Sequence, residues 1–400
     1  MSLFFSVIPV AEAIRILTSA AAPGGTEEIP LGEGLHRVLS ADVPSDTDIP
    51  GFTRSVVDGY GVRAADTTGA GDAVPSMLRW MGTVPMGGVP DRAVAPGECL
   101  YVPTGAVLPD GADAVVMVEH TEQARDLVLI RRPVAKGENV LARGEDYPRG
   151  GMVLPKGRRL RPQDLGVLAA AGRSRILVFR QPRVGIISTG NELVPVTAFP
   201  SASQVRDVNS SLCAGFLQEH GCVPRCFGIV KDEQGLLRAA LDRALFECDA
   251  VLVSGGSSKD ARDHCASAIA ERGEVLAHGI ALQPGKPTIL GQVQGKPVIG
   301  LPGHPASAYI VLRALVRPLI GVMAGGLPPE RRVGAHLAEN IPSPKGREDW
   351  VRVRLEGDLA RPVFGKSGLL NTLAASDGVV VVPAEREGME AGEVVEVILW

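Results

Sequence analysis

The sequence predicts a multidomain protein that combines α/β with β units. Its 400 residues exceed what a single hydrophobic core usually organises. Strand-like and helix-like patterns alternate from about residue 176 to residue 324, and this order favours a mostly parallel sheet with helices on both faces. Short apolar runs broken by Gly and Pro occur before this stretch, and strand patterns return after residue 328. They predict separate β-rich units.

The composition is that of an ordinary folded protein. Hydrophobic residues make up 45% of the chain and charged residues 22%, and the net charge of −4 comes without a long Lys/Arg block. No apolar run approaches the roughly 20 residues that span a bilayer, and residues 3–9 lack the basic flank of a signal peptide. We therefore expect a cytoplasmic protein with no nucleic-acid partner and no membrane partner.

The cysteine and histidine positions do not predict a zinc site. Cys222 and Cys226 lie close together, but no second ligand pair follows them. His264, His278 and His304 are too widely spaced to suggest a ligand triad. We expect buried structural thiols at all six cysteines, which are Cys99, Cys213, Cys222, Cys226, Cys248 and Cys265.

Periodicity and turn residues place the elements along the chain. An amphipathic helix is expected over 10–21, and a second helix over 163–172 follows Pro162. Asp232 is a candidate N-cap for a helix that carries Leu237 and Leu241. Strands are expected at 114–118, 127–130, 184–188, 226–230, 250–253, 288–290, 298–301, 350–355, 379–382 and 394–399, and further helices at 210–220, 265–271 and from 306.

Three strand ends in the α/β stretch carry similar loops. The segments 188–192, 254–258 and 302–305 are rich in small residues and contain Gly. Because ligands of such sheets bind at the carboxyl ends of the strands, these loops could converge on one anionic ligand.

Two of the local motifs suit an anion. Residues 254–258, Ser-Gly-Gly-Ser-Ser, have the make-up of a phosphate-holding loop, although an ordinary tight turn explains them about equally well. Lys286 lies in a stiff Pro-Gly-Lys-Pro turn, which without context is more often a solvated turn. Asp58, Asp146, Glu192 and Asp263 lie in or near Gly-rich segments, and together they suggest Mg²⁺ beside a phosphate, although each alone is more often a cap or turn residue.

Nine short segments, taken in order, resemble the molybdopterin molybdenumtransferase family, which comprises the MoeA proteins and the C-terminal part of gephyrin. Each motif alone is weak, but the nine occur in register over nearly the whole chain. They are 50–60, 103–106, 111–116, 143–146, 188–193, 207–209, 254–256, 284–287 and 301–307.

The resemblance implies a domain plan and a homodimer. A helix in residues 1–25 would pack on an αβα three-layer molybdopterin-binding domain at 176–325. An elongated split domain would comprise 26–45 and 140–175, with a β-rich domain inserted at 46–139 and a C-terminal β-barrel at 326–400. The active cleft of family members lies between the αβα domain of one subunit and the inserted domain of the other.

The resemblance also implies the chemistry. Family members take adenylylated molybdopterin, load molybdate or tungstate with Mg²⁺ as cofactor, and release AMP. A separate molybdopterin adenylyltransferase and acceptor molybdoenzymes would be further partners. Matched positions suggest catalytic roles for Asp58, Asp146, Glu192 and Asp263, metal binding by Glu192, Asp232 and Asp263, and substrate binding by Thr104, Thr189, Gly190, Ser254, Gly255, Gly256, Ser258, Lys286, Pro302, Gly303, Pro305 and Ser307.

The chain departs from the family pattern at several positions, which leave Glu192, Asp263 and Lys286 in place. Asn191 occurs where Asp is common in the family, Asp260 where Gly is common, and Gln283 where Lys is common. His304 occurs where Asn is frequent, and Thr53-Arg54 occurs where an Asp-Asn pair is frequent. A non-catalytic molybdopterin carrier or scaffold is the alternative function, because fold does not fix function. The intact acidic set favours the enzyme, and hydrolysis of a nucleotide pyrophosphate ranks last because it leaves two domains unexplained.

Overall fold

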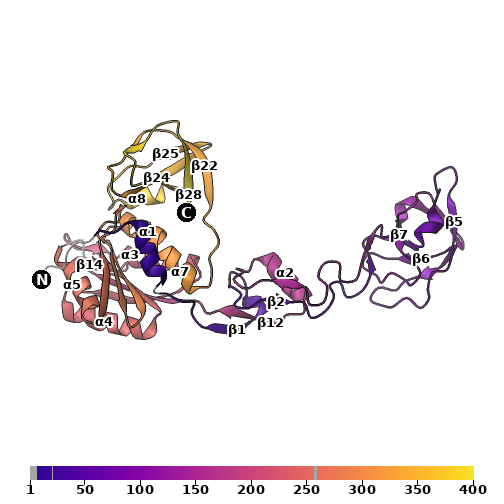
Figure 1. Ribbon diagram of the computed structural model, residues 1–400, viewed down its shortest axis with the longest axis horizontal. Helices are drawn as coiled ribbons and strands as arrows, with labels where there is room; N and C mark the ends of the chain where they lie inside the picture. The colour runs from indigo at the N-terminus through magenta and orange to yellow at the C-terminus, as the bar shows by residue number, and fades with distance from the viewer. Residues whose placement is uncertain (1–6, 20, 256–258) are drawn as a thin grey trace.

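The protein is elongated, with its units arranged along one long axis. The computed structural model describes residues 7–19, 21–255 and 259–400, and for 259–263 it describes the backbone alone. At one end an α/β unit lies against a C-terminal β unit, a slender split domain forms the middle, and an inserted β domain lies at the far end (Figure 1).

The α/β unit is built on a six-stranded sheet whose spatial order is β16-β13-β17-β21-β20-β18. The first four strands are parallel, and β20 and β18 are antiparallel additions at one edge, so the predicted mostly parallel sheet is confirmed. The strands span Val223–Val230 (β16), Arg183–Thr189 (β13), Ala250–Gly255 (β17), Lys296–Leu301 (β21), Ile289–Val293 (β20) and Gly273–His278 (β18).

Helices cover both faces of this sheet because alternate strand residues point to opposite sides. Leu252 of β17 packs in one core with helices α1 (Val10–Ser19), α3 (Asn209–Glu219), α6 (Pro305–Val311) and α7 (Arg317–Met323). Its neighbours Val251 and Val253 pack in the opposite core with α4 (Gln234–Glu247) and α5 (Lys259–Ala270). Three layers therefore result, and the carboxyl ends of β13, β17 and β21 lie together at one edge.

The helical run from Pro305 to Met323 corrects the sequence expectation that no apolar segment approaches the length that spans a bilayer. A π-helical turn, Leu312–Val316, joins α6 to α7, and the run is long and apolar enough to cross a membrane by length and composition. It is nevertheless 72% buried inside the protein, where it packs against α1 and the sheet. Burial in a protein core accounts for its hydropathy.

The split domain is formed by two distant chain segments. Strand β1 (Thr26–Pro30) pairs antiparallel with β12 (Arg175–Phe179), and β2 (Val43–Pro44) pairs with β11 (Met152–Leu154). Helix α2 (Pro162–Ala170) packs beside them. Strand β12 begins at Arg175, so the predicted boundary at residue 175 falls at the start of a strand that continues to Phe179.

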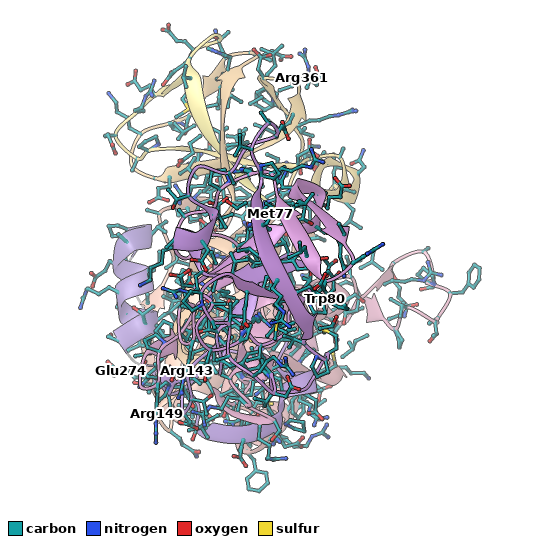
Figure 2. The ribbon with its side chains drawn as sticks, turned by 90° about the vertical axis from the view of Figure 1, so that its right-hand side faces the viewer. Met77, Trp80, Arg143, Arg149, Glu274 and Arg361 are labelled. Carbon is teal, nitrogen blue, oxygen red and sulfur yellow. The ribbon has the colours of Figure 1, made fainter. Side chains whose placement is uncertain are left out.

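The inserted domain contains a six-stranded sheet of order β7-β4-β6-β5-β9-β8. The chain enters and leaves it through the short pair β3 (Arg54–Ser55) and β10 (Val140–Leu141). Viewed along the long axis, Met77 and Trp80 of β5 lie nearest the viewer, at the end remote from the α/β unit (Figure 2). The strands are β4 (Gly59–Val62), β5 (Ser76–Thr83), β6 (Glu98–Val102), β7 (Ala114–Met117), β8 (Thr121–Ala124) and β9 (Leu127–Ile130).

The C-terminal unit is a closed barrel that shares a core with the α/β unit. Strands β24, β25, β22, β28 and β26 pair in that order, and β26 returns to β24. Trp350, Val379 and Ile398 of the barrel pack in the core of α1, α6 and α7. The strands span Arg332–Leu337 (β22), Glu348–Glu356 (β24), Leu359–Pro362 (β25), Gly378–Val382 (β26) and Val394–Leu399 (β28).

Two local predictions were wrong. Glu233, not Asp232, is the N-cap residue of α4. Cys226 is exposed on edge strand β16, whereas the other five cysteines are buried and all six are free thiols. Burial raises the pKa of Cys265 to about 12, so this thiol stays protonated and unreactive.

Candidate active site

A cavity of about 350 Å³ opens at the carboxyl edge of the parallel strands. It includes residues from all three predicted strand-end loops, which therefore do converge. Of the predicted site residues, Thr189, Glu192, Ser254, Gly255, Gly303 and Pro305 line it. The other lining residues are Leu193, Val205, Arg206, Asp207, Val208, Asn209, His304, Gly368 and Leu370.

The loops after β13 and β16 each bring one acidic side chain, Glu192 and Asp232, to this edge. The buried Thr189 hydroxyl donates to Oδ1 of Asp232 over 2.6 Å, and the Asp232 backbone N–H donates to Asn191 Oδ1 over 3.3 Å. The Glu192 side chain is folded over Gly190, where a Cβ would lie 2.8 Å from Glu192 Oε2. Glycine at 190 therefore lets the carboxylate approach the loop backbone.

The loop after β17 passes very close to the end of β13. Gly255 has a φ of +135°, and a Cβ built on it would lie 1.8 Å from the carbonyl oxygen of Thr189. Only glycine fits this position without a backbone shift. Ser254, which precedes it, is buried with only 1% of its surface exposed and lines the cavity. Gly256 and Ser258 lie outside the described residues, and so does the side chain of Asp263.

The start of α3 supplies residues that the sequence pattern did not assign to the site. Asp207 accepts hydrogen bonds from the backbone N–H and the hydroxyl of Ser210, and Ser210 is joined to Ser188 of β13 by a 2.7 Å hydroxyl contact. Asn209 contacts the end of β17 and the loop after β21. The segment 207–209 was noted as a motif, but no pattern in it shows which loops its side chains join.

The C-terminal unit forms another wall of the cavity. His304, which begins the turn into α6, makes a 3.0 Å hydrogen bond through Nδ1 to the hydroxyl of Ser367. Gly368 and Leu370, the first residue of α8 (Leu370–Ala374), also line the cavity. Their segment is more than 60 residues away in the sequence, so no local signal could place it here.

Besides Gly190 and Asp232, three predicted residues of the α/β unit lie near this edge without lining the cavity. Pro302 and Ser307 flank the loop that contributes Gly303, and both are buried. Lys286 is exposed on the turn that follows strand β19 (Leu282–Gln283), which pairs with β24 of the barrel. Their expected contacts with substrate remain predictions.

Three other predicted residues lie in the middle and far parts of the molecule. Asp58 Oδ1 accepts a 2.8 Å hydrogen bond from the backbone N–H of Thr104, so these two residues are neighbours in the inserted domain. Asp146 is exposed beside the junction with the split domain, where its N–H donates to the carbonyl of Ile49 over 3.1 Å. None of the three lines the cavity of its own chain. The inserted domain lies at the far end of the molecule from the α/β unit (Figure 1).

The described carboxylates fit a magnesium site in which the protein supplies only one or two ligands. No group of three or more metal-ligating side chains occurs in the part of the chain that the structure describes. Glu192 lines the cavity and Asp232 contacts Thr189 at its edge. Mg²⁺ is typically held by one or two carboxylates, with phosphate oxygens and water completing its shell, and this donor set fits that pattern.

Comparisons with known proteins agree with the fold. Residues 8–172 match the model of the MoeA N-terminal region (domain I and II), residues 185–321 a probable molybdopterin binding domain, and residues 334–400 the MoeA C-terminal region (domain IV). A molybdopterin molybdenumtransferase of Bacillus subtilis (strain 168) is 32% identical over 98% of this chain and 94% of its own. The chain belongs to the MoeA family.

Other MoeA relatives cover the chain equally well. A molybdopterin molybdenumtransferase of Staphylococcus aureus (strain COL) is 30% identical over 98% of this chain and 95% of its own. A crystal structure of a molybdopterin biosynthesis MoeA protein from Pyrococcus horikoshii OT3 superposes with a TM-score of 0.89, at 33% identity over 99% of this chain and 100% of that one. The MoeA assignment makes the protein a transferase of molybdenum cofactor biosynthesis.

Proposed function

We propose that the protein inserts molybdate or tungstate into adenylylated molybdopterin and releases AMP in a Mg²⁺-dependent reaction. The observation that carries this proposal is the cavity at the sheet edge, where the buried hydroxyl of Ser254, the close turn at Gly255 and the carboxylate of Glu192 face one space. Hydroxyls and backbone N–H groups after a strand are suited to a phosphate, and carboxylates beside them to its metal ion.

The roles of the individual residues follow from their positions. Ser254 and Gly255 would bind the phosphate and pterin end of the substrate, and Pro305 with Gly303 would shape the pocket for the oxyanion. Glu192 and Asp232 would hold Mg²⁺, which neutralises phosphate charge when it is bound. Thr189 fixes the orientation of Asp232 through its 2.6 Å hydrogen bond.

A homodimer would complete the site. Asp58, Thr104 and Asp146 do not line the cavity of their own chain, and the inserted domain lies at the far end of the molecule from the α/β unit (Figure 1). A symmetric pair can bring the inserted domain of each subunit to the cavity of the other. Adenylylated molybdopterin would come from a separate molybdopterin adenylyltransferase, and the finished cofactor would pass to acceptor molybdoenzymes.

The competing function is a carrier that binds molybdopterin without loading metal. Incubation of the purified protein with adenylylated molybdopterin and Mg²⁺ separates the two functions. The transferase releases AMP only when molybdate or tungstate is added, and chelation of Mg²⁺ abolishes release. AMP release that is indifferent to the oxyanion, or no release despite tight pterin binding, would refute the proposal.

A further inference from the structure

Asn209, the first residue of α3, lies where the three strand-end loops meet. It is 7% exposed and lines the cavity. Nothing in its sequence segment indicates a chemical role, and an amide can neither transfer protons at neutral pH nor bind Mg²⁺ through its nitrogen. Its contacts, however, differ from those of an ordinary helix-start residue, because its Oδ1 accepts no N–H group of its own helix among the described residues.

The Asn209 amide nitrogen joins two loops that are far apart in the sequence. Nδ2 donates to the Ser254 hydroxyl oxygen over 2.8 Å and to the Gly303 carbonyl oxygen over 2.9 Å. Gly303 offers only a carbonyl oxygen to this contact, so the atom facing it is the NH₂ group and the amide orientation is fixed. Both N–H groups of the amide are therefore used, one on each loop.

This arrangement determines whether the Ser254 hydroxyl acts as a hydrogen-bond donor or as an acceptor in the cavity. A serine hydroxyl has one proton and two acceptor lone pairs. Because Ser254 Oγ already accepts from Asn209, its own proton is left to donate elsewhere, and no acceptor for it occurs among the described residues. In the cavity, that proton is available to an oxygen atom of a ligand.

A second feature of Asn209 also indicates that a ligand belongs here. Its Oδ1 is buried and has no hydrogen-bond partner in the described part of the chain. An unmet buried acceptor costs about 1–3 kcal/mol, and such groups are rare in folded proteins. A donor on a bound molecule would remove this cost.

We infer that Asn209 is a positioning residue that presents the Ser254 hydroxyl as a hydrogen-bond donor to an acceptor oxygen of the substrate and holds the Gly303 loop at a fixed distance from it. The inference rests on the proposed function, because it assumes that molybdopterin or its adenylylated form occupies this cavity. It adds that Asn209 holds Ser254 and the Gly303 loop in place before the substrate binds.

A double-mutant cycle tests this coupling. The dissociation constant of adenylylated molybdopterin is measured for the wild type, N209A, S254A and the double variant, with S307A and N209A/S307A as the matched control cycle. N209A and S254A should each raise the dissociation constant by roughly tenfold. The dissociation constant of the double variant should stay within about twofold of that of the single variant that binds less tightly. In the control cycle the losses should multiply, because Asn209 makes its side-chain hydrogen bonds among the described residues to Ser254 and Gly303 and not to Ser307.

A second variant covers a failure of N209A to fold. N209D keeps the shape of the side chain but replaces the NH₂ donor by an acceptor, which takes the Ser254 proton and repels the Gly303 carbonyl. It should bind at least tenfold more weakly, and the part of this loss that runs through the Ser254 hydroxyl should disappear in the S254A background, while the part caused by the Gly303 contact persists. Losses that multiply in both Ser254 cycles would overturn the inference. A wild-type protein that does not bind the substrate at all would overturn the proposed function as well.

Discussion

The hydroxyl of Thr189 donates a 2.6 Å hydrogen bond to the carboxylate of Asp232 at the mouth of the cavity. Thr189 ends β13, and Asp232 follows the neighbouring parallel strand β16, so the pair joins two adjacent strand ends. The backbone N–H of Asp232 is held in turn by Asn191. One acidic group of the site is therefore fixed by contacts from the strand beside it.

Replacement of Thr189 by Val removes this donor and keeps the side-chain shape. Because a hydrogen bond to a charged group is worth about 1.5–3 kcal/mol, metal transfer should fall by roughly tenfold or more. The measurement is AMP release at saturating oxyanion over a range of Mg²⁺ concentrations. Thr18→Val is the matched control, since that hydroxyl only bonds within α1; equal rates for both variants would remove Thr189 and Asp232 from the mechanism.

The close approach of Gly255 to Thr189 predicts a second effect. A Cβ at 255 would lie 1.8 Å from the Thr189 carbonyl oxygen, so G255A must displace the loop, at a cost of about 1–3 kcal/mol in unfolding free energy. Urea unfolding and substrate binding should both be impaired. G215A is the control: a Cβ there meets nothing within 4 Å, and Ala in this helix should leave stability unchanged or raise it by up to about 1 kcal/mol. Equal unfolding midpoints for the two variants would contradict the loop geometry.

The proposed division of the site between two subunits predicts that two inactive variants complement each other in a heterodimer. D58N and E192Q should each lower metal transfer by roughly tenfold or more, as expected for the loss of one electrostatic contact. In a purified D58N–E192Q heterodimer, one of the two sites combines an intact cavity with an intact inserted domain, and activity should recover to about half that of the wild type.

A matched heterodimer gives the control for this result. D58N and D146N both alter the part of the site that the partner would supply, so their heterodimer has no intact site and should stay inactive. Recovery in that control, or none in the D58N–E192Q pair, would show that the inserted domain does not act across the subunits.

The parts of the site that follow local rules could be predicted from the sequence. Buried strands ending in Gly-rich loops identified β13, β17 and β21, and the topology of parallel strands implied that Thr189, Ser254 and Gly303 would meet. The αβα unit and the terminal β unit followed from periodicity in the same way.

The remainder of the site depends on contacts that local patterns do not encode. Gly368 and Leu370 reach the cavity only because the barrel shares a core with α6 and α7. Asn209 is a helix-start residue whose amide turns to other loops. The expected placing of Asp58 and Asp146 came from family resemblance alone, and neither residue lines the cavity of its own chain.

The contribution of the junction between the split domain and the α/β unit to the free energy of unfolding should depend on pH. Arg180 and the backbone N–H of Arg183 donate to Asp249 over 2.8 and 2.7 Å. Burial alone would raise the pKa of Asp249, but the hydrogen bonds from Arg180 and Arg183 outweigh it, and the pKa lies below its ordinary value of 3.8. A lowered folded-state pKa contributes stability above the unfolded value, and this contribution is lost as pH falls through the folded value.

The variant D249N should therefore lose about 1 kcal/mol of unfolding free energy at pH 6, and its difference from the wild type should shrink below pH 3.8. Urea midpoints at pH 6, 4 and 3 give this comparison. D91N, which alters a side chain that is 86% exposed, is the control and should match the wild type throughout. A D249N deficit that is constant from pH 6 to pH 3 would mean that the charge of Asp249 contributes nothing.

A single-turnover reaction with adenylylated molybdopterin, Mg²⁺ and either molybdate or tungstate tests the transferase most directly. Both AMP and the metal retained on the pterin are followed in the same sample. We predict that AMP appears only with the oxyanion and that about one metal atom is transferred for each AMP; the faster oxyanion identifies the preferred substrate. Tight pterin binding without oxyanion-dependent AMP release would contradict metal insertion and identify the protein as a carrier.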